Sequence, residues 1–444
     1  MTRRDFLKGA AVTSSLWVGP WARGLAEAPS ERITVAVIGC GLMGMGHLNR
    51  CLGDPGVQVL AVCDVDRTRR EDAQGRVESV YADKTASGHF RGCKAYNDYR
   101  DVIARPDLDA VLIATPDHWH AIISAHAAQS GKDVYCEKPI SITIQEGRRL
   151  SEVIGSHARV FQTGTQYRSR PVVRRICQCV REGVLGRVKH VFTLWSRVQG
   201  SLAPVNPMLP AEPVPEGLDW DLWVGPAPWR PYNSAYHRNP PPGVVPWAFC
   251  EDFGVASVTW HHSHSADVIQ YGLGQEKGGP IEILHPSSGE FPTLTYRYGN
   301  GTLLHLVEHW GRVGDLYDVL PKDAKLAGNF GGVFVGERGW ITTMYGGGPI
   351  EGGPEGIFEE MGLKNREVSG ANDHHANWFQ CIKTRGRPSS DEEIGHRSAS
   401  LGHLAIAAFK LERSLKWDPV KEEFLGDEQA NRLRSKATRQ PWSM

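Results

Sequence analysis

The chain has 444 residues, and its 50 lysines and arginines are matched by 50 aspartates and glutamates, so the formal net charge is zero. Nucleic acids and anionic membranes bind proteins with a clear excess of basic residues, so this balance argues against both as partners. Hydrophobic residues at 41% and charged residues at 23% are typical of a soluble globular protein. The length predicts roughly two or three domains.

The first residues, 1–26, have the parts of an export signal in order. The pair Arg3-Arg4 precedes a short apolar run over 10–18, and Gly24-Leu25-Ala26 is a candidate cleavage site. The run is far shorter than the about 20 apolar residues that span a bilayer. We therefore expect a twin-arginine signal peptide and a periplasmic or secreted protein that is exported folded. A disordered tail with a chance arginine pair is the alternative.

The nine cysteines are odd in number and include no Cys-x-x-Cys pair. A chain of this length does not need disulfide bonds to hold a core. We expect free, buried thiols.

A glycine-rich turn follows the first apolar run. Residues 32–38 are typical of a buried parallel strand, and a second run, 57–63, ends at Asp64, 20 residues after Gly44. Such glycines let a backbone approach a pyrophosphate, and a carboxylate at this distance accepts hydrogen bonds from ribose hydroxyls, which favours NAD. Nearby arginines at 67, 69 and 70 leave NADP open. The turn residues predicted to bind the cofactor are Gly39, Gly41, Leu42, Met43 and Gly44.

Strands and helices continue to alternate, with strands expected at 108–114, 133–136 and 159–162 and helices at 115–130 and 144–154. This alternation predicts a doubly wound parallel sheet in a nucleotide-binding domain over 27–165. Ligands bind at the carboxyl ends of such strands. The cofactor contacts expected there are Thr115, Pro116, His118, His120, Glu137 and Lys138, with Gln166 just beyond the domain.

The second half of the sequence predicts a separate α+β domain over 166–416. A helix is expected from 166 to about 182, and strands at 186–192, 293–298, 302–309 and 332–342 predict a large open, mostly antiparallel sheet. The window 200–250 holds twelve of the 28 prolines and several tryptophans. It is either a lid that stacks on a sugar or an arm anchored on the protein or on another subunit. Residues 417–444 form a polar C-terminal arm.

Three motifs in this order resemble one family: the glycine turn, Thr-Pro-Asp-His-Trp-His at 115–120 and Glu-Lys-Pro at 137–139. The chain is similar, over roughly 32–444, to the glucose–fructose oxidoreductase/inositol dehydrogenase/rhizopine-catabolism (Gfo/Idh/MocA) family. The resemblance implies that Lys138 contacts both the nicotinamide and a substrate hydroxyl. A cation there stabilises a developing alkoxide. It also implies a homo-oligomer, a dimer or tetramer.

The resemblance continues at His264 and Asp267, which match the catalytic His-x-x-Asp of the family. It implies that His264 is the base and that Asp267 orients it. The family usually has an aspartate four residues before this histidine, where this chain has Trp260, so its site is expected to differ from that of cyclitol enzymes. The full set of expected substrate contacts is Lys138, Tyr167, Arg168, Trp260, His261 and His264.

Two histidine groups leave alternatives. His261 and His264, with Glu251 and Asp252 nearby, are compatible with a metal site, but the implied chemistry needs no metal and we expect none. The pair His374-His375 precedes a predicted helix at 376–384, where it serves local packing or reaches the site from a distance.

Together these features predict an exported NAD(P)-dependent oxidoreductase that moves a hydride between a sugar or glycoside hydroxyl and its nicotinamide cofactor. Because the periplasm lacks a ready pool of free NAD, we expect the cofactor to be retained. One alternative is an NAD-dependent glycosidase that works by transient oxidation and elimination. The other is a sugar-sensing protein without catalysis.

Overall fold

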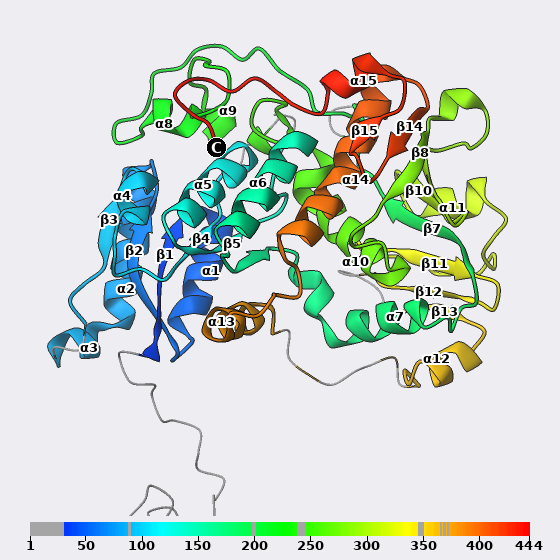
Figure 1. The fold of residues 1–444 in the computed structure, drawn as a ribbon, viewed down its shortest axis with the longest axis horizontal. Helices are drawn as coiled ribbons and strands as arrows, with labels where there is room; N and C mark the ends of the chain where they lie inside the picture. Colours follow the sequence, from blue (N-terminus) through cyan, green and yellow to red (C-terminus); the bar gives the residue numbers. More distant parts are fainter. Residues whose placement is uncertain are drawn as a thin grey trace, which may run out of the picture.

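The computed structural model describes residues 31–87, 90–197, 201–237, 246–344, 350–364, 366, 370 and 373–444. The predicted signal peptide, 1–26, lies outside these ranges. Two sheets lie side by side, one in each half of the molecule, and segments from the end of the chain cross both halves (Figure 1).

The N-terminal sheet has six parallel strands in the order β3-β2-β1-β4-β5-β6. This order is that of a doubly wound dinucleotide-binding fold, so the predicted Rossmann domain is confirmed. The sequence analysis missed β3, a three-residue edge strand that carries an exposed lysine. The strands are β1 (Ile33–Ile38), β2 (Val57–Cys63), β3 (Lys94–Tyr96), β4 (Ala110–Ile113), β5 (Asp133–Cys136) and β6 (Phe161–Thr163).

Helices cover both faces of this sheet because its strands are aliphatic on both sides. One face packs on α4 (Tyr99–Ile103), α5 (Asp117–Gln129) and α6 (Ile144–Ser156). The other packs on α1 (Leu42–Leu52), α2 (Arg67–Val80) and α13 (His374–Thr384). Helix α13 comes from the C-terminal half of the chain, and its buried Trp378 and Phe379 complete the core of the N-terminal domain.

The second sheet has nine strands in the order β13-β12-β11-β7-β10-β9-β8-β14-β15. Only the β7–β10 pairing is parallel among the described strands of this sheet, so the mostly antiparallel prediction is confirmed. The strands are β7 (Val188–Leu194), β8 (Pro280–Leu284), β9 (Thr295–Tyr298), β10 (Leu303–Val307), β11 (Val333–Gly336), β12 (Trp340–Thr342), β13 (Gly352–Gly353), β14 (Leu415–Asp418) and β15 (Glu423–Phe424).

One strand prediction in this sheet is wrong. Residues 332–342 form two antiparallel strands, β11 and β12, and not a single one. The chain reverses at 337–339, where Gly339 has a φ of 159°, a conformation that strongly favours glycine. The aliphatic run on both sides of the turn concealed the reversal.

Helices α7 (Pro171–Arg181), α10 (Ser263–Leu273) and α14 (Glu392–Leu411) cover one face of the second sheet and form the largest core. The opposite face carries Phe192, Val307 and Val333, which pack beneath a segment that includes Trp310 and α11 (Gly311–Leu316). Helix α14 also packs against α6, which joins the two halves. The remaining short helices are α3 (Ala82–Ala86), α12 (Gly356–Glu360) and α15 (Glu428–Arg432).

The proline- and tryptophan-rich window lies over the carboxyl ends of the N-terminal strands. We call its described part, 201–237 and 246–250, the cap. It contains α8 (Trp220–Val224), α9 (Ser234–His237) and the short turn η3 (Trp247–Phe249). The C-terminal arm runs back across the molecule to lie on the cap near α8 and α9 (Figure 1).

All nine cysteines are buried and free, as predicted. Among the described helices none is both long and apolar enough to cross a lipid bilayer.

Candidate active site

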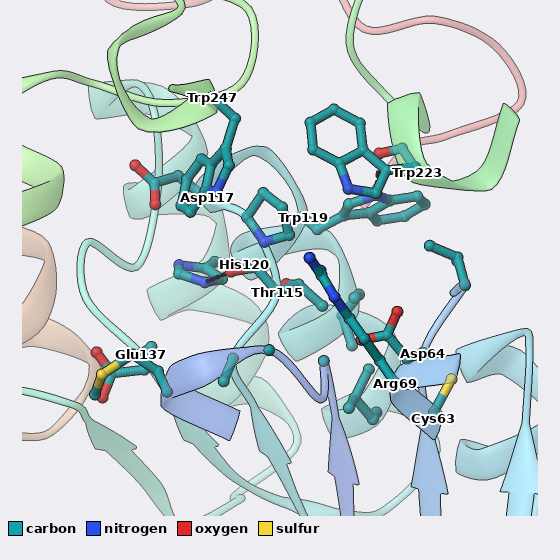
Figure 2. A pocket seen from close by; sticks show the side chains of 18 of the residues that line it. Cys63, Asp64, Arg69, Thr115, Asp117, Trp119, His120, Glu137, Trp223 and Trp247 are labelled. Carbon is teal, nitrogen blue, oxygen red and sulfur yellow. Dashed lines mark hydrogen bonds between the residues drawn. The ribbon is translucent and has the colours of Figure 1, made fainter. Parts of the chain in front are cut away.

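A cavity of about 380 Å³ opens at the carboxyl ends of the N-terminal strands, beneath the cap. Figure 2 shows Asp64 and Arg69 at one end of it and Glu137 at the other, with Trp119, Trp223 and Trp247 along its upper side. The predicted residues that line it are Gly39, Gly41, Leu42, Met43, Asp64, Thr115, Pro116, His120, Glu137, Lys138 and Trp260.

The start of α1 forms the floor of this cavity. Gly41 precedes the helix, no side chain caps its first amide groups, and a Cβ added to Gly41 meets nothing within 4 Å. Gly39 has a φ of 88°, and a Cβ there meets the Ala114 backbone at 2.6 Å. A Cβ on Gly44 meets the Gly39 carbonyl oxygen at 1.8 Å. Uncapped amides at a helix start bind phosphate, so the turn fits a dinucleotide pyrophosphate.

Asp64 stands at the end of β2. Its Oδ2 accepts a hydrogen bond of 2.7 Å from the Cys40 amide, and its Oδ1 accepts one of 2.8 Å from the Asp66 amide. Burial raises the pKa of Asp64, although these two hydrogen bonds oppose the rise. The carboxylate retains lone pairs for ribose hydroxyls, and the Arg69 side chain lies beside it (Figure 2).

The cap closes the cavity from above. Leu222, Trp223, His237 and Trp247 line it from the cap side. The cap is attached to the nucleotide-binding domain beside Asp64, where the Asp219 amide donates to Val65 O (3.0 Å) and the Arg67 amide donates to Gly217 O (2.9 Å). Arg69 Nη2 donates to His237 O at 3.1 Å. A nucleotide in the cavity would lie between the cap and the nucleotide-binding domain.

Lys138 follows the end of β5, and its side chain reaches the backbone of Thr259 and Trp260. Its Nζ donates to Thr259 O at 2.6 Å and to Trp260 O at 3.2 Å. Both acceptors belong to η4 (Val258–His262), a π-helical turn that leads into α10. Two of the three ammonium protons are thereby used, and the third remains for a bound hydroxyl.

Glu137 anchors a buried hydrogen-bond chain below Lys138. Its Oε1 lies 2.9 Å from His47 Nε2 and 2.7 Å from Gln166 Nε2, and His47 Nδ1 lies 3.0 Å from His375 Nε2. Burial raises the pKa of Glu137, but the His47 hydrogen bond and the charges around it lower it more, so the group stays ionised. At the start of α13, His375 therefore belongs to this buried network, whereas His374 lies 2.9 Å from Thr163 O and 2.7 Å from Ser169 Oγ.

His264 lies on α10 and His261 on η4, and their rings stack on Phe330 at centroid distances of 5.0 and 5.8 Å. Neither belongs to the cavity lining among the described residues. Burial and the nearby Lys138 ammonium lower the pKa of His264 to about 3, and its Nδ1 is buried with no hydrogen-bond partner. The ring is neutral and has a nitrogen free to accept a proton.

Asp267 does not hold His264 in this structure. Its Oδ1 accepts a hydrogen bond of 2.7 Å from Arg168 Nη1, and Arg168 also pairs with Glu276. All of Arg168 is buried, at 4% exposure, so this residue lies away from the cavity where a substrate contact was expected. A buried guanidinium needs a carboxylate partner. Arg168 and Asp267 therefore bind each other, whereas the sequence predicted that Arg168 contacts substrate and that Asp267 orients His264.

Three other predicted residues are not among the described residues that line the cavity. His118 places its two ring nitrogens 3.2 and 3.0 Å from the carbonyls of Phe253 and Trp223, so it ties α5 to the cap and to the segment that follows the cap. Gln166 Nε2 donates to Glu137 Oε1 and to the Tyr135 hydroxyl, both at 2.7 Å. The Tyr167 hydroxyl donates to Thr343 O, inside the second domain.

The sequence analysis missed several lining residues. Asn97, Asp98 and Tyr99 follow β3, and the same strand-end rule would have found them had that strand been recognised. Asp117 and Thr259 also line the cavity, and Asp117 lies within the Thr-Pro-Asp-His-Trp-His motif. The cap residues carry no local signal beyond their tryptophans.

Models of two protein-family domains match the chain. Residues 33–165 match the oxidoreductase family, NAD-binding Rossmann fold, and residues 172–307 and 359–444 match its C-terminal alpha/beta domain. The matched segments cover most of the chain, and the first makes the N-terminal domain an NAD-binding one.

Curated relatives are more distant and match over part of their length. The chain is 27% identical to a glycosyl hydrolase family 109 protein of Shewanella pealeana over 183 residues, which are 40% of this chain and 39% of that protein. It is 29% identical to a levoglucosan dehydrogenase of Pseudarthrobacter phenanthrenivorans over 158 residues, 36% and 39% of the two chains. The chain thus spans less than half the length of these relatives.

Solved structures share the fold over most of the chain. The WlbA dehydrogenase of Chromobacterium violaceum, in complex with NADH and UDP-GlcNAcA, has a TM-score of 0.57 at 17% identity and covers 87% of this chain and 96% of its own. A levoglucosan dehydrogenase in complex with NADH has a TM-score of 0.55 at 16% identity, over 87% and 99%. On the evidence of both domain models, the chain belongs to the Gfo/Idh/MocA oxidoreductase family.

Proposed function

We propose that the protein is an NAD(P)-dependent oxidoreductase that removes a hydride from a sugar or glycoside hydroxyl-bearing carbon. The observation that carries this proposal is the position of Lys138, fixed on two carbonyls of η4 at the lip of a nucleotide-sized cavity. NAD, when bound, accepts the hydride. The aromatic rings of Trp247 and Trp260 on the cap side suit the apolar face of a pyranose.

The chain's own groups supply the proton chemistry. The Lys138 ammonium orients the hydroxyl and stabilises the negative charge that develops on its oxygen. We propose that His264, which is neutral, has an unpartnered Nδ1 and interacts electrostatically with Lys138, accepts the hydroxyl proton, although it is not among the described residues that line the cavity. Ionised Glu137 offsets the positive charge gathered at this end of the cavity.

We further infer that the cofactor is retained between turnovers. The cap covers the cavity and is bonded to the nucleotide-binding domain beside Asp64. The Arg3-Arg4 signal pattern supports export of the protein in its folded state, and a retained nucleotide suits a compartment without free NAD. A second sugar or carbonyl compound would then reoxidise it. Replacing both arginines by lysine and comparing cytoplasmic and periplasmic protein tests the export step.

A glycosidase that uses transient oxidation is the second candidate, favoured by the similarity to glycosyl hydrolase family 109 proteins. One assay separates the two functions. Purified protein is incubated with a panel of free sugars and aryl glycosides while nicotinamide absorbance and released phenol are followed. The proposal expects an absorbance change at the bound cofactor. Released phenol without net NADH identifies the glycosidase, and sugar binding without either signal identifies a sensor.

We expect the K138M variant, which keeps most of the length of the side chain without its charge, to lose sugar oxidation by at least about 100-fold, as for loss of a group that stabilises an oxyanion. Bound nucleotide is measured in the same variant, so that loss of turnover is separated from loss of the cofactor. Wild-type turnover in K138M would contradict the proposed role.

A further inference from the structure

The cavity contains a buried carboxyl group to which no role has been given. Asp117 begins α5, is 1% exposed and lines the cavity on the side of Trp247 and Glu137 (Figure 2). Its Oδ2 accepts a hydrogen bond from the Thr259 hydroxyl. The backbone carbonyl of the same threonine accepts the Lys138 ammonium at 2.6 Å. Asp117, Thr259 and Lys138 are therefore consecutive members of one bonded group.

We propose that Asp117 is the positioning residue for Lys138: it fixes Thr259, and thereby the carbonyl on which the ammonium rests, and its negative charge attracts that ammonium. This inference rests on the proposed function only in that Lys138 is the group that meets the substrate hydroxyl. It assigns a residue that acts through its neighbours and does not itself touch substrate.

The surroundings of Asp117 favour a role beyond helix capping. A carboxylate at the first turn of a helix gains from the helix dipole even when it is exposed to water. This one is buried, at a cost in solvation that an exposed aspartate would avoid. The Thr259 hydroxyl also accepts a 3.0 Å hydrogen bond from the Val255 amide, so the threonine side chain has no rotational freedom left.

The charge of Asp117 changes near neutral pH. Burial raises the pKa of Asp117 to about 7, while the Thr259 hydrogen bond and the Lys138 ammonium limit the rise and Glu137 adds to it. On its own helix His118 and His120 have lowered pKa values through burial, and so does His261 on η4. These rings are neutral, so among the described residues Glu137 and Lys138 are the charges recorded as acting on Asp117.

The test measures the basicity of Lys138 directly, without a substrate. The protein as purified is labelled with trace acetic anhydride from pH 6 to 9, and acetylation of Lys138 is compared by mass spectrometry with that of Lys364, whose side chain is 80% exposed. In wild type, the Lys138 ammonium is attracted by ionised Asp117 and bonded to the Thr259 and Trp260 carbonyls. The D117N variant keeps the shape and the hydrogen-bond acceptor but has no charge, so Lys138 should be labelled about tenfold faster at pH 8, the effect of one pKa unit.

Two threonine variants separate positioning from simple packing. T259V removes the hydroxyl and should raise the pKa of Asp117, so its labelling at pH 8 should resemble that of D117N. T259S restores the hydroxyl and should recover the wild-type profile. D391N changes another buried aspartate, which caps α14 outside the cavity, and should leave Lys138 unaffected.

The same variants are then assayed for oxidation of the most active sugar of the panel as a function of pH. We expect D117N to lose the dependence on a group of pKa near 7 and to lower kcat more than it raises KM. An unchanged Lys138 labelling profile in D117N and T259V overturns the inference. Normal turnover in K138M overturns the proposed function instead, and the labelling result stands apart from it.

Discussion

At the scale of single residues, the aspartate of the His-x-x-Asp motif pairs with an arginine and not with the histidine of the motif. Asp267 and Arg168 form a buried ion pair, with side chains 1% and 4% exposed. Among the described residues, no hydrogen bond joins Asp267 to His264. Burial raises the pKa of Asp267 to about 6, and Arg168 limits the rise. The aspartate is thus a counter-ion of the second domain, while His264 is left with a free nitrogen.

This assignment predicts that D267N is mainly a stability variant. It leaves the Arg168 charge buried with one partner fewer, so we expect the free energy of unfolding to fall by about 3 kcal/mol. Urea unfolding of D267N and of H264Q measures it. H264Q should retain wild-type stability and lose turnover. A stable D267N protein with the activity of H264Q would instead show that Asp267 orients the histidine.

At the scale of elements, the C-terminal arm clamps the cap to the nucleotide-binding domain. Arg439 donates from Nε to Gly225 O at 2.7 Å and from Nη1 to Asp221 Oδ1 at 2.6 Å, on and beside α8. Trp442 packs edge-on against Trp119, a cavity residue, with ring centroids 4.8 Å apart. The last residues of the chain therefore hold the cap in place over the candidate cofactor site.

We expect R439A to release the nucleotide at least about tenfold faster than wild type, because three side-chain hydrogen bonds to the cap are lost and a single factor of ten needs only about 1.4 kcal/mol of their combined effect. Fluorescence of bound NADH after mixing with excess NAD measures the dissociation rate. R432A changes an exposed arginine on α15 of the same arm and serves as the control. Equal rates in all three proteins would mean that the arm has no part in retention.

At the scale of the whole molecule, the two halves are joined by an ion-pair cluster. Arg148 of α6 binds Glu393 of α14 at 2.7 Å and Glu422, between β14 and β15, at 3.0 Å. Burial opposes ionisation of both glutamates, but hydrogen bonds, from Arg148 to Glu393 and from His396 and Arg148 to Glu422, lower the pKa of each to about 2. Their stabilising effect is present above the ordinary glutamate pKa and is lost as the pH falls toward 2.

Acid unfolding tests this junction. Thermal melts from pH 7 to pH 3 should show the Tm of wild type falling below about pH 5. The free energy of unfolding of R148M at pH 7 should be about 2 kcal/mol lower than that of wild type, a moderate loss because Arg148 is partly exposed. The Tm of R148M should also fall less steeply as the pH decreases. R149M alters the neighbouring, exposed arginine and should match wild type. If the Tm of R148M falls with decreasing pH as steeply as that of wild type, the acid sensitivity comes from groups outside this ion-pair cluster.

The sequence predicted those parts of the molecule whose signals are local. The glycine turn, Asp64 and Glu137-Lys138 follow strongly patterned strands, and the strand-end rule placed them around one cavity. The rule failed where a side chain turned to a distant partner. His118 bonds to the carbonyls of Trp223 and Phe253, 105 and 135 residues away, and Arg168 pairs with Asp267, 99 residues away. Such pairings depend on tertiary packing, which no local pattern encodes.

The central claim is that this chain is an NAD(P)-dependent oxidoreductase that keeps its cofactor under the cap. The most direct test is to denature the protein as purified and to identify the released nucleotide by chromatography and mass spectrometry. The account predicts about one NAD or NADP per chain, in either redox state. A protein that is empty as purified and exchanges added nucleotide rapidly would contradict it.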